Sequence, residues 1–446
     1  MMKKRAFITV PISILLIAVI VTSFFLFNIK PDTSKISQAQ KLSEYSKPAV
    51  VRIIDYAIVD WQFYDYYTDV GLEVDAILQQ LNYQTIVGGS GSGAIISPNG
   101  YVVTNAHVVE TSQMEDVDIA TAGLEQLAAI VADYYQEDYS IAYEYLWNFL
   151  EYTTVTKVQK VVLPGGDILD GEVKSYGAPF NEGKDVAVLK IEGKNLPTLP
   201  LGDSETIEDQ NNIWVIGYPG AADSELLSPD SALESSMNGG QITATSKALE
   251  QGGSPVIQID AAATHGNSGG PVINEKGEII GLLTFGPEVQ GFNFAVPVNT
   301  VKEFVNQAGA KNTSSSTNKL FKEGLELYWG GYYKDALEKF EAVQRIYPNH
   351  SEIKQYITNA EKKAGDSKIL WSDYKLLFYI IDGVLALVII FLMIFTFVLK
   401  PKSTAVAAGP TVSTDNIPDL NRDGKIDMED VLLALKKQQD EEKEKE

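Results

Sequence analysis

The sequence contains no cysteine, so neither a disulfide bond nor a thiolate–zinc site can form. Basic residues are few, because 36 Lys and Arg stand against 59 Asp and Glu, which gives a formal net charge of −23. Nucleic-acid binding requires a basic footprint, and we therefore expect no nucleic-acid partner. Histidine is also scarce, with three in the whole sequence. A chain of 446 residues is expected to form two or three domains.

A serine lies inside a glycine-rich turn at residues 266–271, which read Gly-Asn-Ser-Gly-Gly-Pro. The glycines leave the backbone free to direct two N–H groups at one point, as acyl transfer requires for its oxyanion. Upstream, residues 104–109 read Thr-Asn-Ala-His-Val-Val. The imidazole of His107 can take up and return a proton near neutral pH. We therefore predict that Ser268 is a nucleophile and that His107 is its base.

A carboxylate that could complete this pair is Asp185, a lone acid that opens a run of β-forming residues at 186–191. We expect its side chain at the mouth of a buried strand, where it would hold the imidazole tautomer and stabilise the imidazolium. The chain order His107, Asp185, Ser268 belongs to the chymotrypsin fold. The alternative interpretation is an inactive protease-like domain that serves as a binding scaffold.

Residues 49–305 resemble a trypsin-like serine protease of the HtrA/Deg subgroup. The matching segments are 91–97, 104–109, 185–190, 217–220, 258–262, 266–271 and 291–297. The resemblance covers a little over half of the chain and implies an all-β domain of two six-stranded barrels, here with a helical insertion at 110–155. Two features depart from the family. No PDZ domain is recognisable after the protease, and His265 occupies a position that is usually proline. We interpret His265 as structural, since a base must approach Ser268 from a separate wall of the cleft.

The resemblance also implies roles for individual residues. Ser268 is similar to the nucleophile, His107 to the general base and acid, and Asp185 to the orienting carboxylate. The backbone N–H groups of Gly266 and Ser268 are similar to the oxyanion hole, and no cofactor is needed for catalysis. The implied substrate pocket, with a preference for small to medium aliphatic side chains, contains Ala262, Thr284, Phe285 and Gly286. The family is often trimeric, so a homo-oligomer is one expectation.

Two apolar runs, residues 6–29 and 376–399, are each long enough to span a bilayer core of roughly 30 Å. The first follows a short basic N-terminus, and we expect an uncleaved anchor, with a cleaved signal peptide as the alternative. The second is flanked by Trp371, Tyr374 and lysines, which suit membrane interfaces. Flanking charges do not decide the orientation. Since long domains translocate regardless of charge, we expect a two-pass protein of the bacterial cell membrane with both termini in the cytoplasm and the protease outside.

A polar linker at 306–318, expected to be flexible, precedes a helical segment at 319–365 that resembles one tetratricopeptide (TPR) repeat. The resemblance rests on the spacing of Leu320, Gly324, Gly331, Tyr332, Ala336, Phe340 and Pro348. A generic helical hairpin is the alternative. One repeat does not normally bury its own core, so the segment would pack on the protease, self-associate, bind a protein partner or act as a spacer. We expect His350, in a turn after Pro348, on the surface.

The tail divides into a linker at 400–417 and a charged segment at 418–446. Residues 419–430 resemble the calcium loop of an EF-hand or a dockerin repeat, with a glycine at loop position 6. The loop positions that supply ligands are held by Asp419, Asn421, Asp423, Lys425, Asp427 and Asp430. Position 12 is aspartate rather than glutamate, Pro418 leaves no preceding helix, and no second loop is present. We expect Ca²⁺ or Mg²⁺ here, with a capped acidic helix N-terminus as the alternative.

Taken together, the sequence predicts an anchor at 1–30, a linker at 31–48, the protease domain and helical segment given above, and a second membrane helix. The predicted function is a membrane-anchored serine endopeptidase that cleaves proteins or peptides outside the cytoplasm, in protein quality control or regulated proteolysis. The alternative is a transmembrane sensor or adaptor whose protease-like domain binds peptides. The insertion carries ten acidic residues and no Lys or Arg, which indicates either a solvated helical hairpin or an acidic lid that attracts basic substrate segments.

Overall fold

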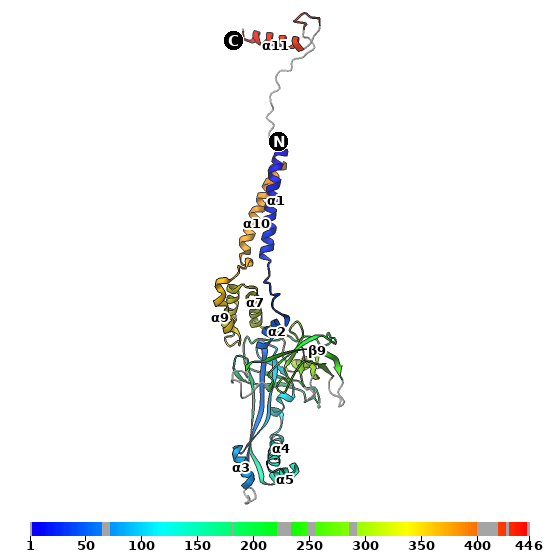
Figure 1. Ribbon diagram of the computed structural model, residues 1–446, viewed down its shortest axis with the longest axis vertical. Helices are drawn as coiled ribbons and strands as arrows, with labels where there is room; N and C mark the ends of the chain where they lie inside the picture. Colours follow the sequence, from blue (N-terminus) through cyan, green and yellow to red (C-terminus); the bar gives the residue numbers. More distant parts are fainter. Residues whose placement is uncertain are drawn as a thin grey trace. The chain divides into compact units, whose positions relative to one another are not determined.

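The computed structural model describes residues 2–64, 72–180, 182–220, 233–247, 255–284, 292–398, 418–424 and 428–443. The chain forms two compact units, of which one is Ile29–Leu370 and the other combines Met1–Asn28 with Trp371–Glu446 (Figure 1). The larger unit contains two β-lobes, a helical arm and a group of three C-terminal helices. Its N-terminal part is the short helix α2, Gln38–Ser46, followed by a 3₁₀ turn at Lys47–Ala49 that leads into the first strand.

The first lobe is a seven-stranded antiparallel sheet in the order β5-β4-β1-β2-β3-β7-β6. Its strands are β1 Val50–Phe63, β2 Gln84–Ile95, β3 Tyr101–Thr104, β4 Leu150–Val162, β5 Ile168–Asp170, β6 Glu172–Tyr176 and β7 Ala187–Lys190. Buried and half-buried residues alternate along β1, as expected for a strand with one face on a core. The expected count of six strands is wrong for this lobe, because seven described strands pair in one sheet. The short strand β5 extends one edge, and β5 and β6 do not pair with each other in the described sheet.

The second lobe is a closed six-stranded barrel in the order β10-β13-β12-β11-β8-β9, which agrees with the expected barrel. Its strands are β8 Asn212–Gly217, β9 Ser236–Lys247, β10 Val256–Ile259, β11 Pro271–Ile273, β12 Ile279–Leu283 and β13 Asn293–Pro297. Helix α6, Val298–Gln307, follows directly. One buried cluster joins the two lobes, because Val103 and Val188 of the first pack in the same core as Ile216 and Leu282 of the second. The functional residues lie at this junction.

Strands β1, β2 and β4 continue beyond the first lobe as a ribbon that carries three helices (Figure 1). These helices are α3 Leu72–Gln80, α4 Asp116–Tyr135 and α5 Tyr139–Phe149, and we call the ribbon end and its helices the arm. The arm has its own hydrophobic core, in which Leu78, Leu127 and Leu146 are completely buried. The predicted helical insertion therefore folds against the ribbon as a separate packing unit.

Three helices follow the second lobe: α7 Ser316–Gly330, α8 Tyr333–Ile346 and α9 Ile353–Lys363. Phe340 fills their centre, and α7 approaches closely because a Cβ at Gly324 would lie 2.6 Å from the Phe340 ring. The expectation of a flexible linker before α7 is wrong. The Asn312 side chain donates hydrogen bonds to the carbonyls of Ile96 and Leu199, and Thr317 donates to the carbonyl of Asn195. These bonds hold the segment on the first lobe.

His350 is buried, which corrects the expectation of a surface residue. Only 3% of it is exposed, and its ring centroid lies 4.3 Å from that of Phe321. The turn between α8 and α9 folds back over the helical core, and the imidazole serves there as an aromatic filler. Burial lowers the pKa of His350 to about 3, so the ring is neutral in the folded protein at physiological pH.

The smaller unit contains the two apolar helices, α1 Met2–Phe27 and α10 Lys375–Met393, the latter extended by a π-helical turn at Ile394–Val398. The stretches Ala6–Phe27 and Trp371–Phe397 are long and apolar enough to cross a membrane. The helices pair antiparallel, since the hydroxyls of Thr9 and Thr396 lie 2.6 Å apart at one end and Phe27 contacts Tyr379 at the other. Helix α11, Met428–Lys443, lies near the C-terminus.

We predict that the buried imidazole of His350 makes the folding stability depend on pH. Its pKa is about 3 in the folded chain and 6.5 when unperturbed, so between these values only the unfolded state binds the proton. Stability is then lost as the pH falls below about 6.5, by roughly 1.4 kcal/mol per pH unit. Hydrogen exchange of α7–α9 amides at pH 7 and pH 5 should show a loss of about 2 kcal/mol in wild type that His350→Phe lacks. An equal loss in both proteins would contradict a neutral buried imidazole.

Candidate active site

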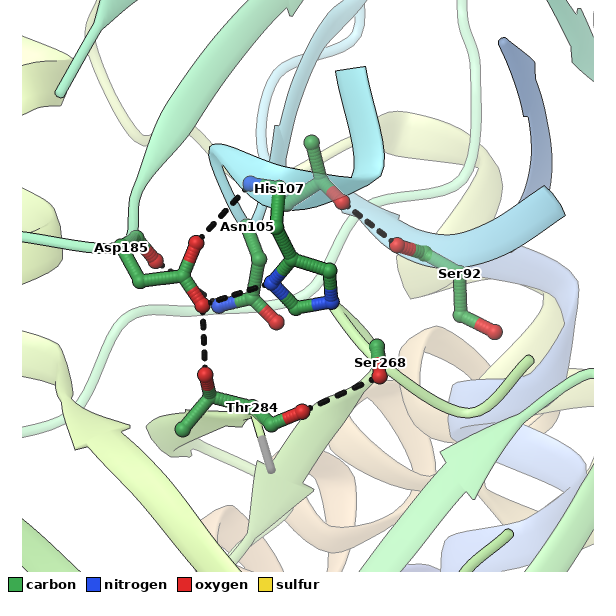
Figure 2. Close-up of polar contacts among 7 residues, drawn as sticks. Ser92, Asn105, His107, Asp185, Ser268 and Thr284 are labelled. Carbon is green, nitrogen blue, oxygen red and sulfur yellow. Dashed lines mark hydrogen bonds and ion pairs between the residues drawn. The ribbon is translucent and has the colours of Figure 1, made fainter. Parts of the chain in front are cut away.

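The imidazole of His107 and the carboxylate of Asp185 form the centre of the site. His107 begins a 3₁₀ turn just after β3, and Asp185 precedes β7, the strand that pairs with β3. The His107 Nδ1 lies 2.8 Å from Asp185 Oδ2, and the His107 backbone N–H donates to Asp185 Oδ1 at 3.0 Å (Figure 2). The Asp185 side chain is 1% exposed and the His107 side chain 29%. One carboxylate thus fixes both the backbone and the ring of the histidine.

Two further residues hold Asp185 in place. The Thr284 hydroxyl, at the end of β12, donates to Asp185 Oδ2, and the Asn105 side-chain amide donates to the Asp185 carbonyl at 2.8 Å (Figure 2). Thr284 was expected in the substrate pocket, and its bond to Asp185 was not anticipated from the sequence. A buried carboxylate costs free energy unless it accepts hydrogen bonds, and the Thr284 hydroxyl supplies one, whereas Asn105 holds the Asp185 backbone.

The Ser268 hydroxyl lies on the far side of the imidazole from Asp185 (Figure 2). It donates to the Thr284 backbone carbonyl at 3.0 Å, so the half-buried serine is oriented by the same residue that contacts Asp185. Rotation about the single Cα–Cβ bond moves a serine hydroxyl between staggered positions. The described arrangement therefore holds the hydroxyl beside the ring in a position from which it can turn toward the imidazole.

The turn that precedes Ser268 leaves two backbone N–H groups free. Gly266 has φ +92°, and a Cβ there would lie 2.4 Å from the Tyr218 carbonyl. The carbonyl of His265 accepts a hydrogen bond from the Gly220 N–H at 2.7 Å, which fixes the peptide group between His265 and Gly266. Within the described part of the chain, the N–H groups of Gly266 and Ser268 donate to no protein acceptor. This geometry suits the binding of an oxyanion.

Ser92 on β2 holds this turn in place through hydrogen bonds. Its hydroxyl donates to the Gly266 carbonyl at 2.7 Å and accepts the Tyr218 N–H at 2.9 Å. Its own backbone N–H donates to the Ser268 carbonyl at 2.7 Å, and its carbonyl accepts from the Thr104 hydroxyl at 2.7 Å. Ser92 is completely buried. This role was not anticipated from the sequence, because nothing in a Gly-Ser-Gly segment reveals which distant turn its hydroxyl contacts.

Acidic groups surround the histidine on one side. Burial raises the pKa of the Glu110 carboxyl, and the negative charges of Glu182 and Asp185 raise it further, whereas His107 lowers it. The pKa of Tyr176 rises to about 12, because of burial first and then because of the charge on Glu110. The carboxylates of Glu110, Glu182 and Asp185 therefore lie on one side of the imidazole.

The other predicted site residues have different outcomes. Ala262 is exposed, and its carbonyl accepts a hydrogen bond from the Asn238 amide at 3.0 Å. Phe285 and Gly286 lie outside the described residues. His265 is exposed and acts through its backbone carbonyl, as its structural interpretation anticipated.

In the tail, the predicted loop ligands Asp419 and Asp430 accept hydrogen bonds from the loop backbone. The Asp419 carboxylate accepts the N–H groups of Arg422 and Gly424, and the Asp430 carboxylate accepts that of Leu420 at 2.7 Å. Asn421 and Asp423 lie in the same turn, joined by a bond of 3.0 Å, whereas Lys425 and Asp427 fall outside the described residues. Among the residues that the structure describes, no group of three His, Cys, Asp or Glu side chains could hold a metal ion. The calcium or magnesium site stays a prediction from the sequence.

Comparisons with known proteins relate the chain to peptidases. Residues 91–282, which include His107, Asp185 and Ser268, match the family model of the trypsin-like peptidase domain. The chain is similar to the putative serine protease HhoB of Synechocystis, at 31% identity over 48% of this chain and 39% of that protein. It is also similar to a probable periplasmic serine endoprotease, DegP-like, of Halomonas elongata, at 31% identity over 49% of this chain and 34% of the relative. The comparisons support an HtrA-type serine protease.

A longer alignment relates the chain to the putative serine protease HhoA of Synechocystis, at 29% identity over 64% of this chain and 59% of the relative. The chain thus spans between 34% and 59% of the length of these three relatives. The family model matches residues 91–282. The arm helices α4 and α5 lie inside the matched range, whereas α7–α9 and both apolar helices lie outside it.

We predict that a side chain at position 266 impairs the reaction of Ser268. Gly266→Ala should slow the reaction of Ser268 with a fluorophosphonate by about a hundredfold, because the added Cβ would collide with the Tyr218 carbonyl and displace the N–H that faces the oxyanion. Gly309→Ala is the matched control, since Gly309 also has a positive φ, +65°, but no atom lies within 4 Å of its added Cβ. Labelling rates of the two purified variants and wild type provide the measurement. Equal rates for both variants would show that the Gly266 amide has no part in the reaction.

Proposed function

We propose that the chain is a membrane-anchored serine endopeptidase with Ser268 as nucleophile, His107 as general base and acid, and Asp185 as the carboxylate that orients the imidazole. The observation that supports this most strongly is the 2.8 Å contact between His107 and the buried Asp185, with the Ser268 hydroxyl beside the same ring. The match of residues 91–282 to the trypsin-like peptidase domain and the similarity of the chain to proteins named as serine proteases also support the proposal.

The proposed reaction proceeds through an acyl-enzyme. The Ser268 hydroxyl turns to His107, transfers its proton to the imidazole and attacks the scissile carbonyl. The negative oxygen of the tetrahedral intermediate accepts hydrogen bonds from the N–H groups of Gly266 and Ser268. Asp185 stabilises the imidazolium, which then protonates the leaving amine. Water activated by His107 hydrolyses the ester and restores the serine.

The proposed location is a membrane, with α1 and α10 as spanning helices and the protease outside the cytoplasm. Both helices expose large apolar side chains along most of their length, which suits a lipid environment. The Thr9–Thr396 contact supports a paired arrangement, since hydroxyl pairs join helices within a bilayer. The DegP-like relative is named as periplasmic, which is compatible with this side of the membrane. Misfolded or membrane-adjacent proteins are the proposed substrates, and quality control or regulated proteolysis the proposed role.

The first test concerns the nucleophile. Wild type should label with a fluorophosphonate and cleave a denatured protein, whereas Ser268→Ala should do neither, with a loss in kcat of about 10⁶-fold. Mass spectrometry of the labelled protein would locate the modified residue. A chain that folds but shows no labelling of Ser268 and no cleavage would favour the alternative, in which the protease-like domain only binds peptides.

The second test concerns the support of the oxyanion site. Ser92→Ala removes the hydroxyl that joins the Gly266 carbonyl to the Tyr218 N–H and leaves both groups without that partner. We expect kcat to fall by ten- to a hundredfold with little change in KM, because the turn supports the transition state rather than substrate binding. Ser90→Ala is the control on the same strand, since Ser90 is exposed. A change confined to KM would contradict this role for Ser92.

A further inference from the structure

The arm carries negative charge with almost no compensation. Residues 115–151 contain nine Asp and Glu and no Lys or Arg, and no basic residue other than His107 occurs between residues 53 and 156. The nearest cation is Lys157, which lies 3.2 Å from Asp116 at the start of α4. The remaining carboxylates of α4 and α5 face solvent, where like charges repel one another. Such a surface attracts positively charged partners.

An aromatic ladder runs along the outer face of α5. We give this name to Tyr139, Tyr143 and Trp147, which are spaced four residues apart and therefore lie on one side of the helix. Tyr139 stacks on Tyr143, and Tyr143 on Trp147, with ring centroids 6.1 Å apart in both pairs. Tyr139 is 46% exposed and Trp147 58%. The ladder is thus an ordered apolar surface that faces water.

The neighbouring face of α5 supplies buried residues to the arm core. Ala142 and Leu146 are buried in the arm core, together with Leu124 and Leu127 of α4. Tyr143 is half-buried and packs against this core, whereas Tyr139 and Trp147 are exposed and are not members of the buried cluster. Exposed apolar patches of this kind mark interaction sites, and stacked aromatic rings present π-faces to which cations bind.

Carboxylates border the ladder. The pKa of Tyr139 is raised, first by desolvation and then by the negative charge of Glu125 on α4, which lies near the Tyr139 hydroxyl. Glu144 is exposed next to Tyr143 in the sequence, and Asp138 caps the N-terminus of α5 by accepting the Ser140 N–H. Aromatic faces with carboxylates at their edges match the long apolar stems and charged heads of Lys and Arg.

We propose that the aromatic ladder of α5, with its bordering carboxylates, docks a Lys- or Arg-containing segment of the polypeptide substrate. The sign of the charge selects this occupant. A second copy of the arm, a nucleic acid and an anionic lipid surface would all be repelled, whereas a cationic chain gains both Coulomb attraction and contact with the rings. The inference rests on the proposed function in so far as the docked chain is the one that is cleaved. Docking would raise the concentration of the rest of that chain near the peptidase domain.

Binding tests the proposal without cleavage. The full-length Ser268→Ala protein in detergent is mixed with a fluorescent, unstructured Lys/Ser peptide or with its Glu/Ser counterpart, and anisotropy gives the Kd. The Lys/Ser peptide should bind, and its affinity should fall as salt is raised, whereas the Glu/Ser peptide should not bind. Adding Tyr139→Ala and Trp147→Ala should weaken binding by about tenfold. Ile168→Ala, at a residue 63% exposed on β5 of the first lobe, is the control and should leave the Kd unchanged. Equal affinity with and without the ladder would overturn the proposal.

Cleavage distinguishes this inference from the proposed function. With an active chain, a substrate that carries the Lys/Ser segment should show a KM about tenfold lower than the same substrate without it, and the ladder variant should abolish that difference. Without the segment, the ladder variant and wild type should have equal kcat. A chain that binds the peptide but cleaves nothing would refute the proposed function and leave the docking surface standing. A chain that cleaves both substrates with equal KM would refute the docking of substrate and leave the protease standing.

Discussion

A carboxylate that is almost wholly removed from water persists only where donors replace its hydration, and the Asp185 side chain is 1% exposed. Its donors come from both lobes. His107 supplies its backbone N–H and lies in contact through its ring, whereas Thr284 supplies a hydroxyl from the end of β12 in the second lobe. Since the carbonyl of the same Thr284 accepts the Ser268 hydroxyl, the satisfaction of one buried charge also positions the serine. The geometry of the site depends on this carboxylate more than on any contact between serine and histidine.

The oxyanion side of the site depends on a second buried polar residue. Ser92 joins β2 of the first lobe to the turn before Ser268 through its hydroxyl, and to Ser268 itself through its backbone. The turn needs this support because Gly266 and Gly269 both have positive φ, which glycine adopts at no steric cost but does not enforce. The free N–H groups are therefore a consequence of tertiary hydrogen bonds that fix a conformationally permissive segment. The two lobes meet through polar bonds at the site and through the shared apolar core beside it.

The sequence was informative where the chemistry is local. His107, Asp185 and Ser268 stand in short motifs whose neighbours set the turn, and the structure brings these three side chains to one place. Thr284 was assigned to the pocket from the resemblance alone. Its bond to Asp185 was missed because it joins residues 99 positions apart, a pairing that no spacing rule reveals. His350 was expected on the surface because a turn after proline is usually solvated, yet its ring packs against Phe321 in the helical core. The seventh strand of the first lobe was missed because β5 has only three residues. The errors at Thr284 and His350 concern residues whose positions are decided by partners far away in the sequence.

The arm shows how surface charge can be concentrated without disturbing the site. Its carboxylates repel one another, and that repulsion is offset by a separate apolar core that contains Trp61, Leu78 and Leu146. The Trp61 indole also donates to the Thr85 hydroxyl at 2.9 Å, which ties β1 to β2 within the ribbon. Because this core shares no member with the cluster that joins the two lobes, changes on the outer face of α5 act on the arm alone. An acidic aromatic surface can therefore vary in its binding properties while the Asp185 carboxylate keeps its donors and the peptidase domain keeps its geometry.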